Sequence, residues 1–228
     1  MELADGVASQ HRRVAWVKHG LIACIVLGIV AVLSNLGQYD LLNDLAAGVS
    51  FDDGTIEAND DRQRLIAWLQ RGALVFTAAC WLVWFHRAYG NLKLLGRKHA
   101  HYGAGWAVGY WFIPLAHLVI PYQMTREIWL KSASAGAVTG EPRRPRARWL
   151  GFWWAGYLTN GVLGRVAAVL SNDAESPDEW VFVTQLSMVG DLSAIVAAVL
   201  ALVVVSSIDR LQLEAVRAAA PEPAVALA

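Results

Sequence analysis

Four long apolar runs constrain this chain more than any other feature of its sequence. They cover residues 20–36, 65–85, 149–170 and 180–205 and are 17 to 26 residues long. A helix rises about 1.5 Å per residue, so even the shortest run spans about 26 Å, just enough to cross the hydrocarbon core of a bilayer. Only 17% of the residues are charged, against about a quarter in soluble domains. These runs predict an all-α integral membrane helix bundle.

A further apolar stretch, residues 105–121, differs from these four because Pro114 and Pro121 interrupt it. Proline removes a backbone donor and breaks a helix. Backbone that is not helical is tolerated at membrane depth only where protein or water satisfies its polar groups. The stretch therefore predicts a re-entrant or interfacial segment that does not cross.

The charges of the connecting segments predict the topology. The 37–64 and 171–179 connectors are acidic, whereas the 86–104 and 122–148 connectors are basic, and basic loops stay on the cytoplasmic side. If 105–121 crossed, the connector after it would carry its six basic residues outside. We therefore predict four transmembrane helices with both termini cytoplasmic, the alternative being five helices with an outer C-terminus.

The ends of the chain are interpreted in the same way. Residues 1–19 are a polar cytoplasmic N-tail, and the apolar run that follows is too long for a cleavable signal peptide and has no small-x-small site after it. Residues 209–228 form a cytoplasmic C-tail, and residues 20–208 form the membrane domain. Arg outnumbers Lys by 15 to 4, which favours a bacterial chain, so we expect the bacterial cytoplasmic (inner) membrane.

Three motifs follow one another around residues 105–121: R-A-Y-x-N-L, then W-A-V-G-x-W-F-I-P, then P-Y-Q-x-x-x-E-I-W. Their residues are Arg87, Ala88, Tyr89, Asn91, Leu92, Trp106, Ala107, Val108, Gly109, Trp111, Phe112, Ile113, Pro114, Pro121, Tyr122, Gln123, Glu127, Ile128 and Trp129. This pattern resembles the bacterial multi-pass membrane family known as domain of unknown function 4328. Members commonly carry Asn-Leu where this chain has His117-Leu118. The resemblance implies an integral membrane protein and implies no activity.

Polar residues around these motifs form the first candidate site. It comprises Arg87, Asn91, His117, Arg126 and Glu127. We expect Arg87 to pair with Glu127 at the cytoplasmic end of the Pro-broken segment. The cluster is interpreted as a structural staple, with a solute or headgroup site as the alternative.

Two charged residues lie inside the last two apolar runs and form the second candidate site. Intramembrane charges are costly, and helix side chains lean towards the N-terminus, so Arg165 and Asp191 can approach each other from antiparallel helices. We expect a static pair that fixes helix register, the alternatives being a role in ion or proton movement and outward snorkelling of Arg165. Asn35 and Asn160 are expected to bridge helices by hydrogen bonds.

The sequence contains no recognisable catalytic set, and no cofactor, metal site or nucleic-acid interface is expected. The His99-x-His101 pair has no carboxylate or Cys beside it in the sequence. The expected partner is the lipid bilayer, with anionic lipid as a candidate at Arg143, Arg144, Arg146 and Arg148. We expect a non-enzymatic membrane scaffold or accessory protein, the alternative being a unit that binds or conducts a small solute or ion. The protein partner and a homo-oligomeric state stay open.

Overall fold

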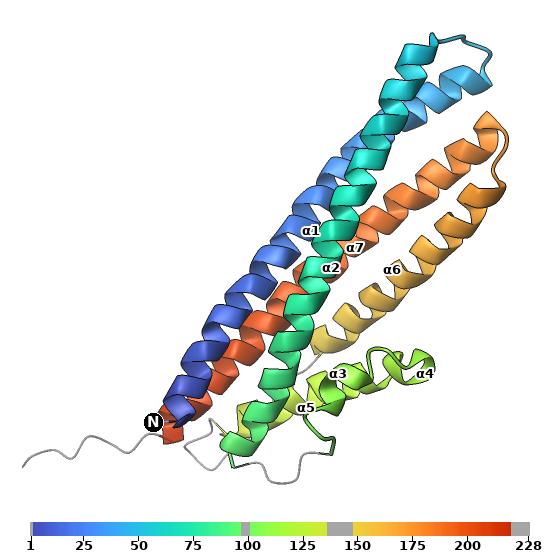
Figure 1. The fold of residues 1–228 in the computed structure, drawn as a ribbon. Helices are drawn as coiled ribbons and strands as arrows, with labels where there is room; N and C mark the ends of the chain where they lie inside the picture. The colour runs from blue at the N-terminus through green and yellow to red at the C-terminus, as the bar shows by residue number, and fades with distance from the viewer. Residues whose placement is uncertain (1, 97–100, 136–147, 220–228) are drawn as a thin grey trace, which may run out of the picture. The chain divides into compact units, whose positions relative to one another are not determined.

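The computed structural model describes residues 2–96, 101–135 and 148–219. Within these ranges the chain is helical and contains no strand, which confirms the all-α prediction for this part (Figure 1). The helices are α1 (Glu2–Ala46), α2 (Asp53–Leu94), α3 (Trp106–Gly109), α4 (Pro114–His117), α5 (Ile120–Ala135), α6 (Arg148–Asp173) and α7 (Pro177–Ala219).

The long helices extend well beyond the apolar runs. The predicted 37–64 connector is wrong as a loop, because α1 continues to Ala46, α2 begins at Asp53, and only residues 47–52 lie outside a helix. The N-tail is also helical from Glu2. The sequence has no proline before Pro114, and a helix that has started propagates cheaply through polar residues. The helices therefore extend past the apolar runs that predicted them.

Two local signals set the limits of α2. Asp52 precedes its first residue and accepts hydrogen bonds from the backbone N–H of Thr55 (3.2 Å) and from its hydroxyl (2.6 Å), as an N-cap does. At the other end Gly96 has φ +76°, a left-handed conformation that glycine adopts without strain. It lies two residues after Leu94, the last residue of α2, and prevents the helix from continuing.

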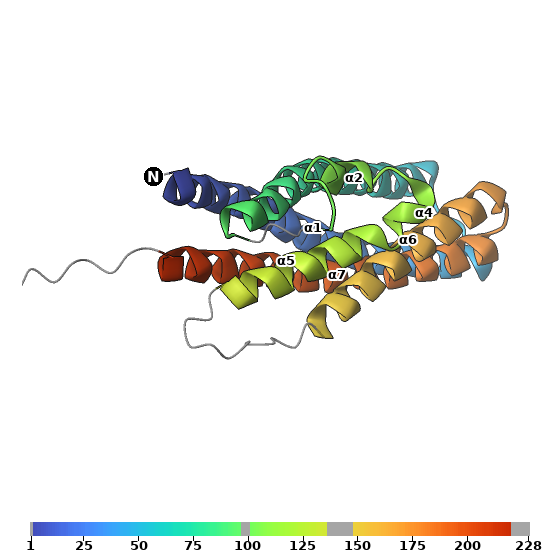
Figure 2. The ribbon, with the colours of Figure 1, turned by 90° about the horizontal axis from the view of Figure 1, so that it is seen from below.

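The Pro-broken segment consists of two helical turns, α3 and α4, followed by the longer α5 (Figure 2). Pro114 is the first residue of α4 and Pro121 the second of α5, positions where the missing N–H of proline costs nothing. A spanning helix needs about 20 residues, and α3 and α4 have four residues each. Neither turn is long enough to cross a bilayer.

The contacts divide the chain into two compact units. Unit 1 comprises Met1–Lys18, Ala79–Gly151 and Val203–Ala228, and unit 2 comprises His19–Ala78 and Phe152–Leu202. The helices α1, α2, α6 and α7 contribute residues to both. Fifteen of the nineteen Lys and Arg residues belong to unit 1, whereas twelve of the nineteen acidic residues belong to unit 2. The segregation of charge along the sequence is thus also a segregation between units.

Unit 2 packs its helices closely through glycines while its surface stays apolar. A Cβ on Gly20 of α1 would lie 2.5 Å from the Thr77 hydroxyl oxygen of α2, and one on Gly28 would lie 2.8 Å from Ile195 of α7. Small residues at helix contacts are typical of membrane bundles. Many apolar side chains on these helices are exposed, for example Val75 at 69%. So much exposed apolar surface is unfavourable in water and suits a lipid environment.

Candidate functional site

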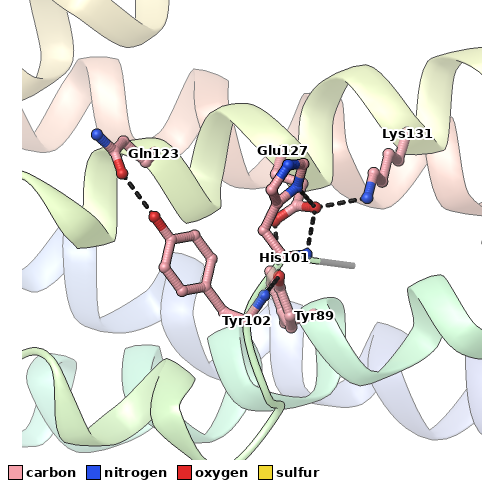
Figure 3. Close-up of polar contacts among 6 residues, drawn as sticks. All are labelled: Tyr89, His101, Tyr102, Gln123, Glu127 and Lys131. Atoms are coloured by element: carbon pink, nitrogen blue, oxygen red, sulfur yellow. Dashed lines mark hydrogen bonds and ion pairs between the residues drawn. The ribbon is translucent and has the colours of Figure 1, made fainter. Parts of the chain in front are cut away.

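The first polar cluster is centred on Glu127 of α5 (Figure 3). Its Oε2 accepts a 2.6 Å hydrogen bond from the Tyr89 hydroxyl of α2. Its Oε1 lies 2.5 Å from Lys131 Nζ, one turn further along α5. The same oxygen accepts from the backbone N–H of His101 and contacts the His101 ring Nδ1, both at 3.0 Å. The Glu127 side chain is only 9% exposed, so most of its interactions are with protein.

The cluster continues through a second tyrosine. The backbone N–H of Tyr102 donates to the Tyr89 oxygen at 2.9 Å, and the Tyr102 hydroxyl donates to Gln123 Oε1 at 2.6 Å. The segment around residues 101 and 102 is thereby tied to both α2 and α5 (Figure 3). We call Tyr89, His101, Tyr102, Gln123, Glu127 and Lys131 the Glu127 cluster.

The hydrogen bonds decide the charge state of Glu127. Burial raises the pKa of its carboxyl, but hydrogen bonds from Lys131, Tyr89 and His101 outweigh burial and lower it from 4.5 to about 2. Hydrogen bonds to the charged form of a carboxylate favour ionisation. Glu127 is therefore ionised at neutral pH and holds the donors around it.

A second network in unit 1 is centred on Gln212 of α7, which is 1% exposed. Its Nε2 donates to the carbonyl oxygen of Ala88 (2.9 Å) and lies 3.3 Å from the Ser132 hydroxyl. Its Oε1 accepts from Asn91 Nδ2 at 3.2 Å. One buried amide thus joins α2, α5 and α7, and its donor and acceptor groups are both used, as buried polar groups require.

Aromatic side chains of α2 pack against those of the Pro-broken segment within unit 1. The Trp81 and Trp84 rings have centroids 5.0 Å apart with an interplanar angle of 61°, and Trp111 lies edge-on to Phe85 at 6.0 Å. The His117 ring is 6.3 Å from Trp111. Trp84 and Phe85 are fully buried, so this group of rings anchors the segment that contains α3 and α4 against α2.

The five residues of the first candidate site are only partly brought together. Glu127 and Asn91 are central, but in separate networks. Arg87 and Arg126 are exposed, and among the described residues Glu127 pairs with Lys131 and His101, so the predicted Arg87–Glu127 pair is wrong. The reason is helix rotation: Tyr89, two residues after Arg87, faces α5 instead. The His117 ring lies beside Trp111.

Several members of these networks were not predicted from the sequence, although the spacing of residues along the helices indicates some of them. Lys131 is four residues after Glu127, a spacing that brings helix side chains together. The spacing of Phe85, Ala88, Tyr89 and Leu92 is that of one buried helix face, which indicates Tyr89 inside and Arg87 outside. His101 acquires a carboxylate neighbour that lies far from it in sequence. Gln212 carried no signal.

The second candidate pair is also wrong. Asp191 of α7 accepts hydrogen bonds from Asn35 Nδ2 of α1 (3.1 Å) and Gln70 Nε2 of α2 (2.9 Å), whereas Arg165 is exposed on α6. The two charges face different directions around their helices, so the partners of Asp191 are neutral amides. The prediction that Asn35 bridges helices is confirmed.

The other predicted features are a metal site, which was not expected, and a basic segment that faces anionic lipid. In residues 2–96, 101–135 and 148–219, no group of three His, Cys, Asp or Glu side chains is placed to hold a metal ion. His99, Arg143, Arg144 and Arg146 lie outside the described residues. Arg148 is exposed at the start of α6.

The fold places this chain in a broad class of proteins. This is an all-helical protein in which α1, α2 and α7 each contain a stretch long and apolar enough to cross a membrane. The chain belongs to the family described as domain of unknown function (DUF4328), whose sequence profile matches residues 47–210. The expected family is thereby confirmed. No curated protein and no solved structure matches the chain.

Proposed function

We propose that the chain is a bacterial inner-membrane protein with four crossings and both termini in the cytoplasm, and that it serves as a non-enzymatic scaffold or accessory protein. The fourth crossing is α6, whose 26 residues give a length of about 39 Å. Its Trp, Tyr and Gly residues lower its hydropathy, yet such residues are common in transmembrane helices and at their interfaces.

One observation carries the topology: the contacts of unit 1 join three basic segments of the chain. Glu127, after the Pro-broken segment, binds Tyr89 and His101, before it. Gln212 in the C-tail binds Ala88 and Ser132. Segments in direct contact lie on the same side of the bilayer. Five crossings would put residues 122–148 and the C-tail on the side opposite to residues 86–104, so the contacts favour four.

The exposed surface of the Pro-broken segment fits an interfacial position within this topology. Phe112 is 72% and Leu115 is 82% exposed, while Ala107 is fully buried. An apolar outer face beside basic connectors is typical of a segment at the boundary between headgroups and acyl chains. In this arrangement Phe112 and Leu115 enter the cytoplasmic leaflet.

The scaffold role is supported by the way the polar groups are used. The Glu127 cluster and the Gln212 network bind their own members and leave no convergent set of groups for a substrate. Networks of this kind fix the mutual register of helices. The buried Gln212 network joins α2, α5 and α7, and the Glu127 cluster ties α5 to α2; both favour a rigid cytoplasmic-side frame over a permeation path.

Cysteine accessibility tests the topology. Cys24 and Cys80 are replaced by Ser, single cysteines are placed at Ser134, Ser176 or Ala218, and intact cells are treated with a membrane-impermeant thiol reagent. We expect labelling at Ser176 only, with all three labelled after the membrane is permeabilised. Labelling of intact cells at Ser134 and Ala218 but not at Ser176 would mean five crossings.

A flux assay separates the scaffold from the permeation alternative. The purified protein is reconstituted into vesicles that contain a fluorescent pH or ion indicator. A scaffold leaves the dissipation of an imposed gradient equal to that of protein-free vesicles. A faster loss that disappears in a protein with disrupted clusters would contradict the proposal.

A further inference from the structure

Asp191 is a carboxylate inside a spanning helix, and both of its hydrogen-bond partners are neutral amides. Oδ1 accepts from Gln70 Nε2 at 2.9 Å and Oδ2 accepts from Asn35 Nδ2 at 3.1 Å. Among the described residues no Lys, Arg or His forms an ion pair with it. A charged carboxylate taken into an apolar medium without a cation carries a large free-energy cost, and two amide dipoles offset only part of it.

The charged groups of the surrounding elements lie elsewhere. On α1 none occurs between His19 and Asp40, and on α7 none besides Asp191 occurs between Glu179 and Asp209. On α2 the Arg71 guanidinium lies over the Trp68 ring, 5.4 Å from its centroid. The Arg62 guanidinium, also on α2, donates to the Ser34 hydroxyl at 3.0 Å and to Asn59 Oδ1 at 2.6 Å. On α6 Arg165 is exposed. Within the described parts of these helices, no cation therefore pairs with Asp191.

The depth of the three side chains is consistent among the helices. Counted from the cytoplasmic ends of the apolar runs, Asn35 is 15 residues in, Gln70 is 15 and Asp191 is 14. At about 1.5 Å per residue these positions lie about 21 to 23 Å into a core about 30 Å thick. The group thus lies in the outer leaflet, within about 9 Å of the outer surface. The identity of that side as the outer one rests on the proposed four-crossing topology.

We propose that Asp191, with Asn35 and Gln70, forms a proton-binding site in the outer half of the membrane. A hydronium ion from the outer water transfers its proton to Oδ1, which forms the O–H bond and releases a water molecule. The Gln70 amide then turns by half a rotation, so that its Oε1 accepts a hydrogen bond from the new hydroxyl. Asn35 continues to donate to Oδ2, and the loaded site is neutral.

The geometry favours a proton over a metal ion. Both carboxylate oxygens already accept from amide N–H groups, and these donors face any cation that approaches, so a metal ion would need both amides to turn their oxygens towards it. A proton needs only the rotation of one amide. The oxygen and NH₂ group of an amide are nearly the same size, so the Gln70 side chain fills the same space before and after this rotation. The hydrogen bonds decide which orientation it adopts.

The site has a consequence that a scaffold alone does not have. When it is loaded, a neutral network fastens α1, α2 and α7 together. When the proton leaves, the charge draws water towards the contact and weakens it. The packing of these three helices is therefore linked to the pH of the outer compartment.

Infrared spectroscopy tests the proposal on the full-length protein in lipid nanodiscs. Aspartate is labelled with carbon-13, so that the carboxylic-acid carbonyl band of a protonated Asp shifts and is recognised. At about pH 7, exposed aspartates are ionised because their ordinary pKa is about 3.9. We expect one labelled band at this pH, its loss in D191N and its retention in D209N, the matched variant at another buried aspartate.

Three outcomes would overturn the proposal. One is the absence of a labelled carboxylic-acid band at neutral pH, which means that Asp191 is charged. Another is a band that survives in D191N or disappears in D209N, which assigns the proton elsewhere. The third is a band absent in sodium but present in a large organic cation, which makes a metal ion the occupant. If D191N fails to fold, the unaltered protein still decides: the band must disappear as the pH is raised. The infrared band reports the protonation of Asp191 and does not depend on the number of crossings. A negative result would therefore overturn the proton site and leave the scaffold proposal unaffected.

Discussion

Replacing Glu127 by Gln keeps the shape of the side chain and removes the charge that organises the Glu127 cluster. Gln can still accept at its oxygen, but its NH₂ group faces Tyr89, His101 or Lys131, all of which act as donors to Glu127. The substitution therefore exchanges attraction for a clash of donors. It changes no apolar contact, so its effect on stability reports on the polar cluster alone.

The magnitude follows from the pKa of Glu127. Lowering this pKa from 4.5 to about 2 corresponds to about 3 kcal/mol of stabilisation of the charged form, at about 1.4 kcal/mol per pH unit. The His101 side chain is 79% exposed, and solvent screens such a partner, so we discount this to about 2 kcal/mol. We expect E127Q to lose about 2 kcal/mol, or about 4 to 8 °C in Tm.

The assay is thermal unfolding of the purified protein in nanodiscs, followed by circular dichroism. The matched control is E214Q, because Glu214 is 47% exposed and lies 3.8 Å from Arg210 across one helical turn. A surface pair of this kind contributes at most about 1 kcal/mol. Equal changes in Tm for E127Q and E214Q would refute the argument that Glu127 holds the cluster together.

The pH dependence gives an independent check with a definite sign. Because the folded-state pKa of Glu127 is lowered, its contribution is fully present above its ordinary value and is lost as the pH falls towards about 2. The difference in Tm between the unaltered protein and E127Q should thus be constant near neutrality and shrink below about pH 4.5. A difference that grows on acidification would contradict it.

Three further substitutions test other parts of the fold by the same unfolding assay. Gln212→Leu removes the buried acceptor of Asn91 Nδ2 and the side-chain donor to the Ala88 carbonyl oxygen, and should cost about 2 to 3 kcal/mol; no loss would mean that the network contributes nothing. Gly20→Ala places a Cβ 2.5 Å from the Thr77 hydroxyl and should cost about 1 to 3 kcal/mol, which the double variant with Thr77→Ala should partly restore. Gly96→Ala forces a left-handed residue at φ +76° and should cost about 1 kcal/mol, whereas Gly90→Ala, within α2 and in open space, should not destabilise.

The sequence predicts the features that depend on local chemistry. Apolar runs of spanning length indicate α1, α2 and α7, because hydropathy needs no knowledge of the partners. Gly96 predicts a helix end and the prolines predict the broken segment between α2 and α5, because both act on their own backbone. The charge of each connecting segment can likewise be counted from the local sequence alone, and it agrees with the division into units 1 and 2.

Features that depend on the direction in which a side chain faces are harder to predict. Arg87 and Tyr89 are separated by about 200° around α2 at 100° per residue, so they cannot both face α5. The positive charge of Arg87 favours it as the partner of Glu127. The spacing of the apolar residues Phe85, Ala88 and Leu92, however, places Tyr89 on the buried face. The spacing prevails because burying several apolar side chains stabilises more than one surface ion pair.

Asp191 and Arg165 show why depth alone does not predict an ion pair. If α6 crosses as proposed, Arg165, which is 16 residues from Trp149, lies about 24 Å into the core, so about 6 Å separates it from the outer surface. The Arg side chain is long enough to carry its charge across that distance while its methylene groups stay in lipid. Asp has a single methylene and cannot do so. At nearly the same depth, a long basic side chain can therefore face the lipid, and a short acidic one must be satisfied inside the bundle, where Asn35 and Gln70 supply the donors.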